Sequence, residues 1–249
     1  MKRSPVATAR RTVRRATTWR PKTAPDSPVD ISALISPLRY DVLVRAQLFD
    51  LVRLQSESVS SDPDALVEAA RASAYFTWFE QVAMDRFRPW VLLDPDLLSS
   101  QFRERVLSAA ALYRSYRQRG FDPAHPVTLR GTKGSMATDS GLTIGKTLHV
   151  GDGGHRLALL LSDGQDLSAG TYRVDWRPLD HLIDNTAVLV PALQLRAGDY
   201  ARFLAPGYGC EPTTDLDELL AEVRHRDPQA GREIAAAAER HLGSTRSPA

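Results

Sequence analysis

The sequence predicts an α+β protein with a small mixed-sheet core, an N-terminal helical layer and a C-terminal helical hairpin. Up to about residue 119, apolar residues recur at the spacing of buried helix faces. From Asp122 the spacing changes to the two-residue period of strands. Two further helical segments, about 216–226 and 229–242, follow near the end, with Asp227-Pro228 between them. Strands flanked by helical segments on both sides indicate the α+β class.

The composition is that of an ordinary globular protein, apart from a strongly basic start. Of the 249 residues, 43% are hydrophobic and 25% are charged, which is enough for one or two domains. The formal net charge is +2, but residues 1–22 carry eight Lys or Arg and no acid, so the remainder carries +2 − 8 = −6. Such a body is not a basic nucleic-acid platform, and nucleic acid is not an expected partner except through the basic tail.

Hydropathy and cysteine content bear on the cellular location. No run approaches the roughly 18 apolar residues that a membrane span requires, and no apolar region follows the Arg-Arg pairs as it would in a signal peptide. The single cysteine, Cys210, excludes an internal disulfide. These features predict a cytoplasmic protein without membrane contact.

The first 94 residues are predicted to form a tail and a helical subdomain. Residues 1–30 lack apolar periodicity, so we expect a disordered basic tail, either a solubilising segment or an arm for anionic surfaces. Residues 31–94 are predicted to be helical, with one helix from Ser36-Pro37 to about Leu54 and a second from Asp62-Pro63 to about Phe87. An apolar, mainly aromatic stripe in the second helix is typical of a core rather than of a base-stacking surface: Tyr75, Phe76, Trp78, Phe79 and Val82.

Residues 95–205 are predicted to form the core domain. A helix over Pro95–Arg119 should end at Gly120, and strands are expected near 127–129, over 142–150 after a long turn, and over 172–176. We then expect a short helix over 178–183, an edge strand or extended segment over 188–195 interrupted by Pro191, and a brief helix capped by Asp199. Residues 206–249 are predicted to be a loop and the helical hairpin. Because that hairpin is typical of a packing or dimerising element, a homodimer stays open.

The stretch from Gly151 to Leu161 (GDGGHRLALLL) carries the strongest functional signal. It predicts the end of a strand, a glycine turn, and a helix that stops at Gly164. Asp152 is the expected N-cap, and His155 and Arg156 should lie in the first helical turn. Free backbone N–H groups and the helix dipole would converge there, which favours a phosphate-sized anion. The alternative is a capped helix start with a solvated His-Arg pair.

This stretch also resembles a known family. The motif Gly-Asp-Gly-Gly-His-Arg, preceded by Arg-Gly-Phe-Asp-Pro at 119–123 and Pro-Val-Thr-Leu at 126–129, is similar to the ParB/sulfiredoxin superfamily. The resemblance covers residues 95–177, about a third of the chain. It implies a ParB/sulfiredoxin-like core that binds nucleotide phosphates at the turn. Members include CTP-hydrolysing partition proteins, the reductase sulfiredoxin and free-serine kinases.

The residues present favour one of these activities. Sulfiredoxin chemistry needs a cysteine directly before the His-Arg pair, where this chain has Gly154. A partition protein needs a helix-turn-helix and a basic DNA-facing surface, whereas the first helix of the predicted C-terminal hairpin is acidic. The turn is closest to that of the free-serine kinases. The resemblance therefore implies a phosphotransferase that uses ATP, or another nucleoside triphosphate, with Mg²⁺ to phosphorylate a small hydroxylated metabolite.

The predicted site residues follow from this resemblance. The expected nucleotide-binding residues are Gly151, Gly153, Gly154, His155, Arg156 and, from the preceding loop, Lys133. The expected catalytic residues are Asp152, His155 and Glu104, of which Glu104 is taken from the glutamate that precedes the helix–strand segment in the serine kinases. No metal-ligating set is assigned, because the histidines are dispersed. The alternative function is a nucleotide-binding switch or a ParB-like DNA-associated protein without kinase activity.

Overall fold

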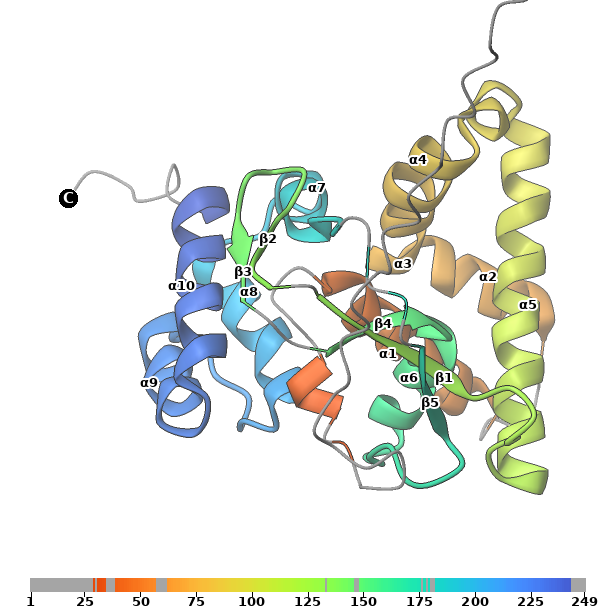
Figure 1. The fold of residues 1–249 in the computed structure, drawn as a ribbon. Helices are drawn as coiled ribbons and strands as arrows, with labels where there is room; N and C mark the ends of the chain where they lie inside the picture. The colour runs from red at the N-terminus through yellow and green to blue at the C-terminus, as the bar shows by residue number, and fades with distance from the viewer. Residues whose placement is uncertain are drawn as a thin grey trace, which may run out of the picture.

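The computed structural model describes residues 29, 31–34, 39–56, 62–132, 134–145, 148–175, 177, 179 and 182–242. A small sheet lies at the centre, with one group of helices beside α5 and another around α9 and α10 (Figure 1). The predicted disordered tail lies outside the described residues except for Val29. That residue pairs with Leu167 through two backbone hydrogen bonds of 2.9 and 3.1 Å, so Val29 itself is not part of a disordered segment.

The N-terminal layer is helical, as predicted. The start signal Ser36-Pro37 falls outside the described residues, and the described helix begins at Tyr40. The long helix α5 matches its prediction at both ends, because Asp94 caps it with two hydrogen bonds and Gly120 ends it at φ +74°. The elements of the layer are η1 (Ile31–Leu34), α1 (Tyr40–Ser56), α2 (Pro63–Arg71), α3 (Ala74–Trp78), η2 (Phe79–Met84), α4 (Asp85–Phe87), η3 (Pro89–Leu93) and α5 (Pro95–Arg119).

The predicted second helix is broken, and Ser73 is the reason. Its hydroxyl donates to the carbonyl of Ala70 at 2.7 Å and accepts from the backbone N–H of Tyr75 at 3.2 Å. The side chain therefore ends α2 and caps α3. The chain then continues through a π-helical segment, η2, in which Phe79, Val82 and Met84 are buried.

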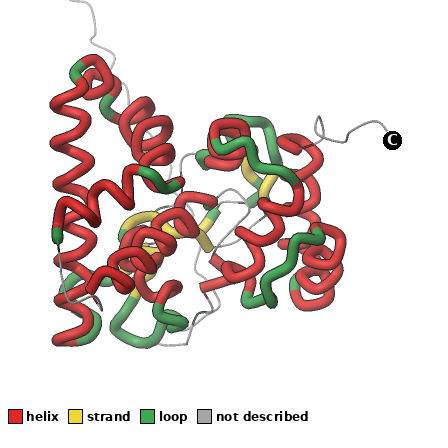
Figure 2. The backbone as a smooth tube through the Cα atoms, turned by 180° about the vertical axis from the view of Figure 1, so that it is seen from behind, coloured by secondary structure: helices red, strands yellow, loops and turns green. Residues whose placement is uncertain are grey.

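The sheet is mixed and has the order β4-β1-β5. Strand β1 (Val127–Gly131) is central, antiparallel to β4 (Leu148–Asp152) and parallel to β5 (Tyr172–Asp175). The predicted return strand over 142–150 is divided: β3 (Thr143–Ile144) pairs with β2 (Met136–Ala137) in a separate small sheet. Helix α6 (Gly154–Ser162) connects β4 to β5. The α+β class is thus confirmed, and Figure 2 shows the few strands surrounded by helices.

The core lies between α6 and the N-terminal layer. Helix α6 packs along α1, and its Leu157 and Leu160 are buried together with Leu48 and Phe49 of α1. Gly164, at φ +63°, ends α6 as expected, and the N–H of Gln165 reaches back to the carbonyl of Leu160. The helix that follows the predicted anion site is therefore anchored in the core.

Two predictions for the segment between β5 and residue 196 are wrong. Residues 188–192 belong to a helix, α7 (Asn185–Ala192), and residues 193–195 follow it without forming a strand, because the Asp184 side chain caps the helix and Leu189 and Val190 are buried. Pro191 is tolerated near the exposed end of that helix. The described residues of the expected 178–183 helix (Leu179, Leu182 and Ile183) are not helical.

The C-terminal hairpin is confirmed. Helix α8 (Ala197–Leu204) carries Asp199 in its first turn, where the carboxylate accepts from the backbone N–H of Arg196, and η4 (Ala205–Tyr208) follows. Helices α9 (Leu216–Arg226) and α10 (Pro228–Leu242) then pack on each other. The ring of His241 on α10 lies 2.9 Å from the buried carboxylate of Asp184, which fixes the hairpin to the start of α7.

Leu160→Ala should lower the free energy of unfolding by about 2–5 kcal/mol, because it opens a cavity where the side chain is only 3% exposed. Leu93→Ala is the matched control. Leu93 is 85% exposed, so its truncation should change stability by less than about 0.5 kcal/mol. Urea unfolding of both variants tests this expectation, and equal stabilities would contradict the packing of α6 on α1.

Candidate functional site

The backbone between β4 and α6 is shaped by two glycines. A bulge separates the pairs Thr128–Asp152 and Leu129–Val150, which leaves Gly151 as the extra residue of β4. Gly153 has φ +87°, and a Cβ there would lie 3.2 Å from the backbone of Val127. The turn therefore requires glycine for both its conformation and its close approach to β1.

The start of α6 corrects one expectation. Gly153, not Asp152, is the N-cap, and the helix begins at Gly154 rather than at Gly153. Asp152 is the last residue of β4, and its carboxylate accepts from the N–H of Gly153 at 2.7 Å. The Asp152 side chain therefore bonds to the N–H of the residue before the helix and does not satisfy the first N–H groups of the helix itself.

The first turn of α6 presents unsatisfied donors. The first intrahelical bond of the turn runs from the N–H of Leu157 to the carbonyl of Gly153, at 2.9 Å. The N–H groups of Gly154, His155 and Arg156 precede it and have no intrahelical acceptor. Among the described residues, no side chain accepts from them. As predicted, His155 and Arg156 both lie in this first turn.

Arg156 is held in place rather than solvated. Its side chain is 24% exposed, and one terminal nitrogen donates to the carbonyls of His125 and Pro126, the latter at 3.3 Å. Another terminal nitrogen lies 3.9 Å from the carboxylate of Asp152. The guanidinium therefore ties α6 to the loop before β1 and places a fixed positive charge beside the turn.

His155 is part of the aromatic core between α6 and α3. Its Nε2 lies 2.9 Å from the hydroxyl of Tyr75, and its ring meets those of Tyr75 and Trp78 edge-on. Burial, with the positive charges of Arg45 and Arg105, lowers the pKa of His155 well below its ordinary value. The imidazole is therefore neutral near pH 7, so it can serve as a hydrogen-bonding group but not as a cation for phosphate.

A cavity of about 350 Å³ opens at this turn. Asp152, Gly153, Gly154, His155 and Arg156 form one wall, and the end of α5 with the loop before β1 forms the other. The second wall had not been predicted. Its residues, together with Leu159 of α6, are Leu112, Ser115, Tyr116, Gly120, Phe121, Asp122 and His125. The signal available in the sequence was the Arg-Gly-Phe-Asp-Pro segment, from which the carboxylate of Asp122 could have been selected.

Two further predicted site residues do not line this cavity, and a third lies outside the described residues. Glu104 is an exposed residue of α5, and it precedes Leu112 by eight residues, or about 12 Å of helix. Gly151 lines a neighbouring cavity instead. Lys133 lies outside the described residues.

A buried charge cluster lies directly behind the turn. The Asp41 carboxylate accepts from Arg39 at 2.8 and 3.0 Å and from Arg45 at 2.6 Å. A Cβ on Gly154 would collide with the Arg45 guanidinium, which shows how closely the cluster approaches α6. Burial alone would raise the pKa of Asp41, but the two guanidiniums overcome this effect and lower it to about 2. Sequence reasoning did not find this cluster.

No family model, curated protein or solved structure matches the chain. Within the described residues, no helix is both long and apolar enough to cross a membrane. No group of three or more His, Cys, Asp or Glu side chains in the same residues is arranged to hold a metal ion. The functional argument therefore rests on the geometry of the turn and its surroundings.

Asp41→Asn should lower the free energy of unfolding at pH 7 by about 3–5 kcal/mol, because two buried guanidiniums lose their carboxylate. The folded-state pKa of Asp41 lies below its ordinary value of 3.8. Its contribution is therefore complete above about pH 4 and is lost as the pH falls through about 2. The variant should lack this part of the acid-induced loss of stability.

The control is Asp64→Asn, whose side chain is 72% exposed and paired with Arg103 at the surface. It should cost no more than about 1 kcal/mol. Urea unfolding between pH 3 and 7 measures both variants. Parallel stability curves for wild type and Asp41→Asn would contradict the assignment.

Proposed function

We propose that this protein is a nucleoside triphosphate-dependent phosphotransferase that acts on a small hydroxylated metabolite. The observation that carries the proposal is the start of α6, where three backbone N–H groups without intrahelical acceptors and the fixed Arg156 charge border a cavity. ATP is the nucleotide we propose, with Mg²⁺ as its counter-ion. The ParB/sulfiredoxin-like motif supports the same reading.

The lining of the cavity suits the two ends of a nucleotide. The phosphate end has the N–H groups of residues 154–156 and the Arg156 guanidinium. The other wall is more apolar and contains Leu112, Tyr116 and Phe121, against which a base can pack. The volume of about 350 Å³ lies near the lower end of known ligand pockets, roughly 300–1,000 Å³.

The carboxylates beside the turn fit a magnesium–nucleotide complex. Mg²⁺ prefers oxygen ligands, keeps several waters and commonly uses one or two carboxylates besides the phosphates. Asp122 lines the cavity on the wall across from the turn, so its carboxylate would hold the ion. When bound, Mg²⁺ would offset the negative charge of the phosphates.

The transfer step assigns a role to each residue. The acceptor hydroxyl oxygen attacks the terminal phosphorus, the bond to the bridging oxygen breaks, and the nucleoside diphosphate leaves. Asp152, 72% exposed at the cavity, is the carboxylate we propose to receive the hydroxyl proton. Neutral His155 would fix the first turn of α6 through Tyr75 rather than carry the proton. Glu104 has no role in this scheme, because it does not line the cavity.

Arg156→Ala should weaken nucleotide binding by about 1.5–3 kcal/mol, or roughly 10- to 150-fold, because it removes a charged donor beside the phosphates. It should also cost about 1 kcal/mol of stability, through its bonds to the carbonyls of His125 and Pro126. Arg177→Ala is the matched control, since Arg177 is 80% exposed and does not line this cavity. Calorimetric titration with Mg²⁺·ATP and Mg²⁺·CTP, together with urea unfolding, measures both effects.

Turnover of ATP distinguishes the proposed phosphotransferase from a nucleotide-binding switch. Release of ADP in the presence of small hydroxylated acceptors such as serine or glycerol, and not in their absence, is the expected result. Tight nucleotide binding without turnover for any acceptor would favour the nucleotide-binding switch. Unchanged nucleotide affinity in Arg156→Ala, or no nucleotide binding by the wild type, would overturn the phosphate site itself.

A further inference from the structure

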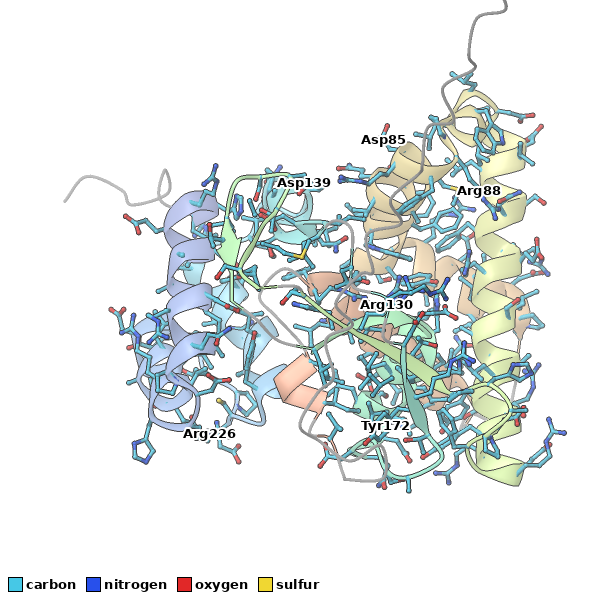
Figure 3. All side chains as sticks on the ribbon, in the orientation of Figure 1. Asp85, Arg88, Arg130, Asp139, Tyr172 and Arg226 are labelled. Atoms are coloured by element: carbon cyan, nitrogen blue, oxygen red, sulfur yellow. The ribbon has the colours of Figure 1, made fainter. Side chains whose placement is uncertain are left out.

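A second cavity, of about 320 Å³, lies next to the turn and shares no lining residue with the first. It is enclosed by the N-terminal layer, strands β1 and β4, and the segment that leads into α7. Arg130 on the central strand marks its position (Figure 3). We call it the arginine cavity, after three of its polar lining residues, which are Arg39, Asp41, Arg45, Trp78, Arg130, His149 and Asn185.

The charges that the described residues bring to the arginine cavity do not balance. Three arginines and one aspartate line it, which gives 3 − 1 = +2. Arg130 is also paired with Asp175 at 3.0 Å, outside the lining, which leaves +1. His149 adds no charge near pH 7, because burial and the neighbouring Arg39 lower its pKa to about 4. Positive charge at a buried site without a matching anion is costly.

Several buried polar atoms in the same lining have no hydrogen-bond partner among the described residues. They are Nε of Arg45, Nε1 of Trp78 and both ring nitrogens of His149. Trp78 is 6% exposed and His149 is 1% exposed. Buried polar groups in folded proteins are nearly always paired, so four unpaired nitrogens in the residues of one cavity wall leave this wall incompletely satisfied.

The charged groups of the lining point to the chemistry of a ligand. The Arg45 guanidinium lies over the Trp78 ring, 4.2 Å from its centroid, and the guanidiniums of Arg39 and Arg130 line the same cavity. The planar N–H fork of a guanidinium matches the two oxygens of a carboxylate. The rest of the lining is apolar and includes Val82, Phe87, Leu182 and Ile183. A ligand with a charged end and an apolar body would meet both parts.

We infer that the arginine cavity is a binding site for a small organic carboxylate with an apolar body. The carboxylate accepts from the guanidiniums of the lining and offsets the excess charge of the arginines, while the apolar body lies against Val82 and Phe87. The inference rests on this cavity alone and does not depend on nucleotide binding at the first one. Free phosphate shares the negative charge but not the apolar body.

The test uses defined probes on the full chain. Hexanoate and benzoate should bind in calorimetric titrations and raise the melting temperature, because each combines a carboxylate with an apolar body. Hexan-1-ol has the apolar body without the charge, and inorganic phosphate has the charge without the apolar body, so both should bind at least tenfold more weakly. Phosphate binding as tight as that of the carboxylates, or no binding of either carboxylate, would overturn the inference.

A conservative variant locates the binding. Arg130→Gln keeps a polar side chain of similar length and removes its charge, so the affinity for benzoate should fall roughly tenfold, as for the loss of one hydrogen bond to a charged group. Arg103→Gln is the matched control, because Arg103 is 46% exposed and does not line the arginine cavity. Unchanged benzoate affinity in Arg130→Gln would place the carboxylate elsewhere.

Discussion

The arrangement of the structure around the turn depends on one buried carboxylate. Asp41 receives hydrogen bonds from Arg39 and Arg45, and the amide of Asn185 on α7 lies 3.2 Å from the same group. Arg39 continues to the carbonyl of Val150 on β4, at 3.1 Å. The cluster thus joins α1, β4 and α7, and it places two guanidiniums behind α6. Without the carboxylate, those charges would be buried without compensation.

The glycine turn between β4 and α6 determines which groups line the first cavity. The bulge at Gly151 changes the direction of β4, and the left-handed Gly153 begins α6 one residue later than the aspartate would. Asp152, whose carboxylate accepts from the N–H of Gly153, therefore lines the cavity instead of capping the helix. The first N–H groups of α6 stay open, and Arg156 is fixed beside them by the carbonyls before β1. Glycine geometry, more than any charged side chain, thus creates the end of the cavity at which we propose that an anion binds.

Local signals in the sequence predicted the elements that depend on local chemistry. Asp94-Pro95 and Gly120 bound α5 as expected, and Gly164 ends α6. The errors arose where a side chain acts against a periodic pattern, as Ser73 does in the second helix, or where a cap outweighs a proline, as Asp184 does in α7. The buried charge cluster could not be predicted, for another reason. An aspartate in the first turn of a helix usually lies in solvent and interacts favourably with the helix dipole. The burial of Asp41 instead results from contacts with β4 and α7, which are distant in sequence.

Arg45 acts electrostatically on both cavities, so a ligand in one cavity should affect binding in the other. Arg45 lines the arginine cavity, approaches Gly154 at the start of α6, and contributes to the low pKa of His155. Part of the positive potential at the start of α6, beside the first cavity, therefore comes from Arg45, which lines the second cavity. A carboxylate bound to Arg45 would reduce that potential, so it would weaken the binding of an anion at α6. Because such coupling is reciprocal, a nucleotide at the turn would weaken carboxylate binding by the same factor.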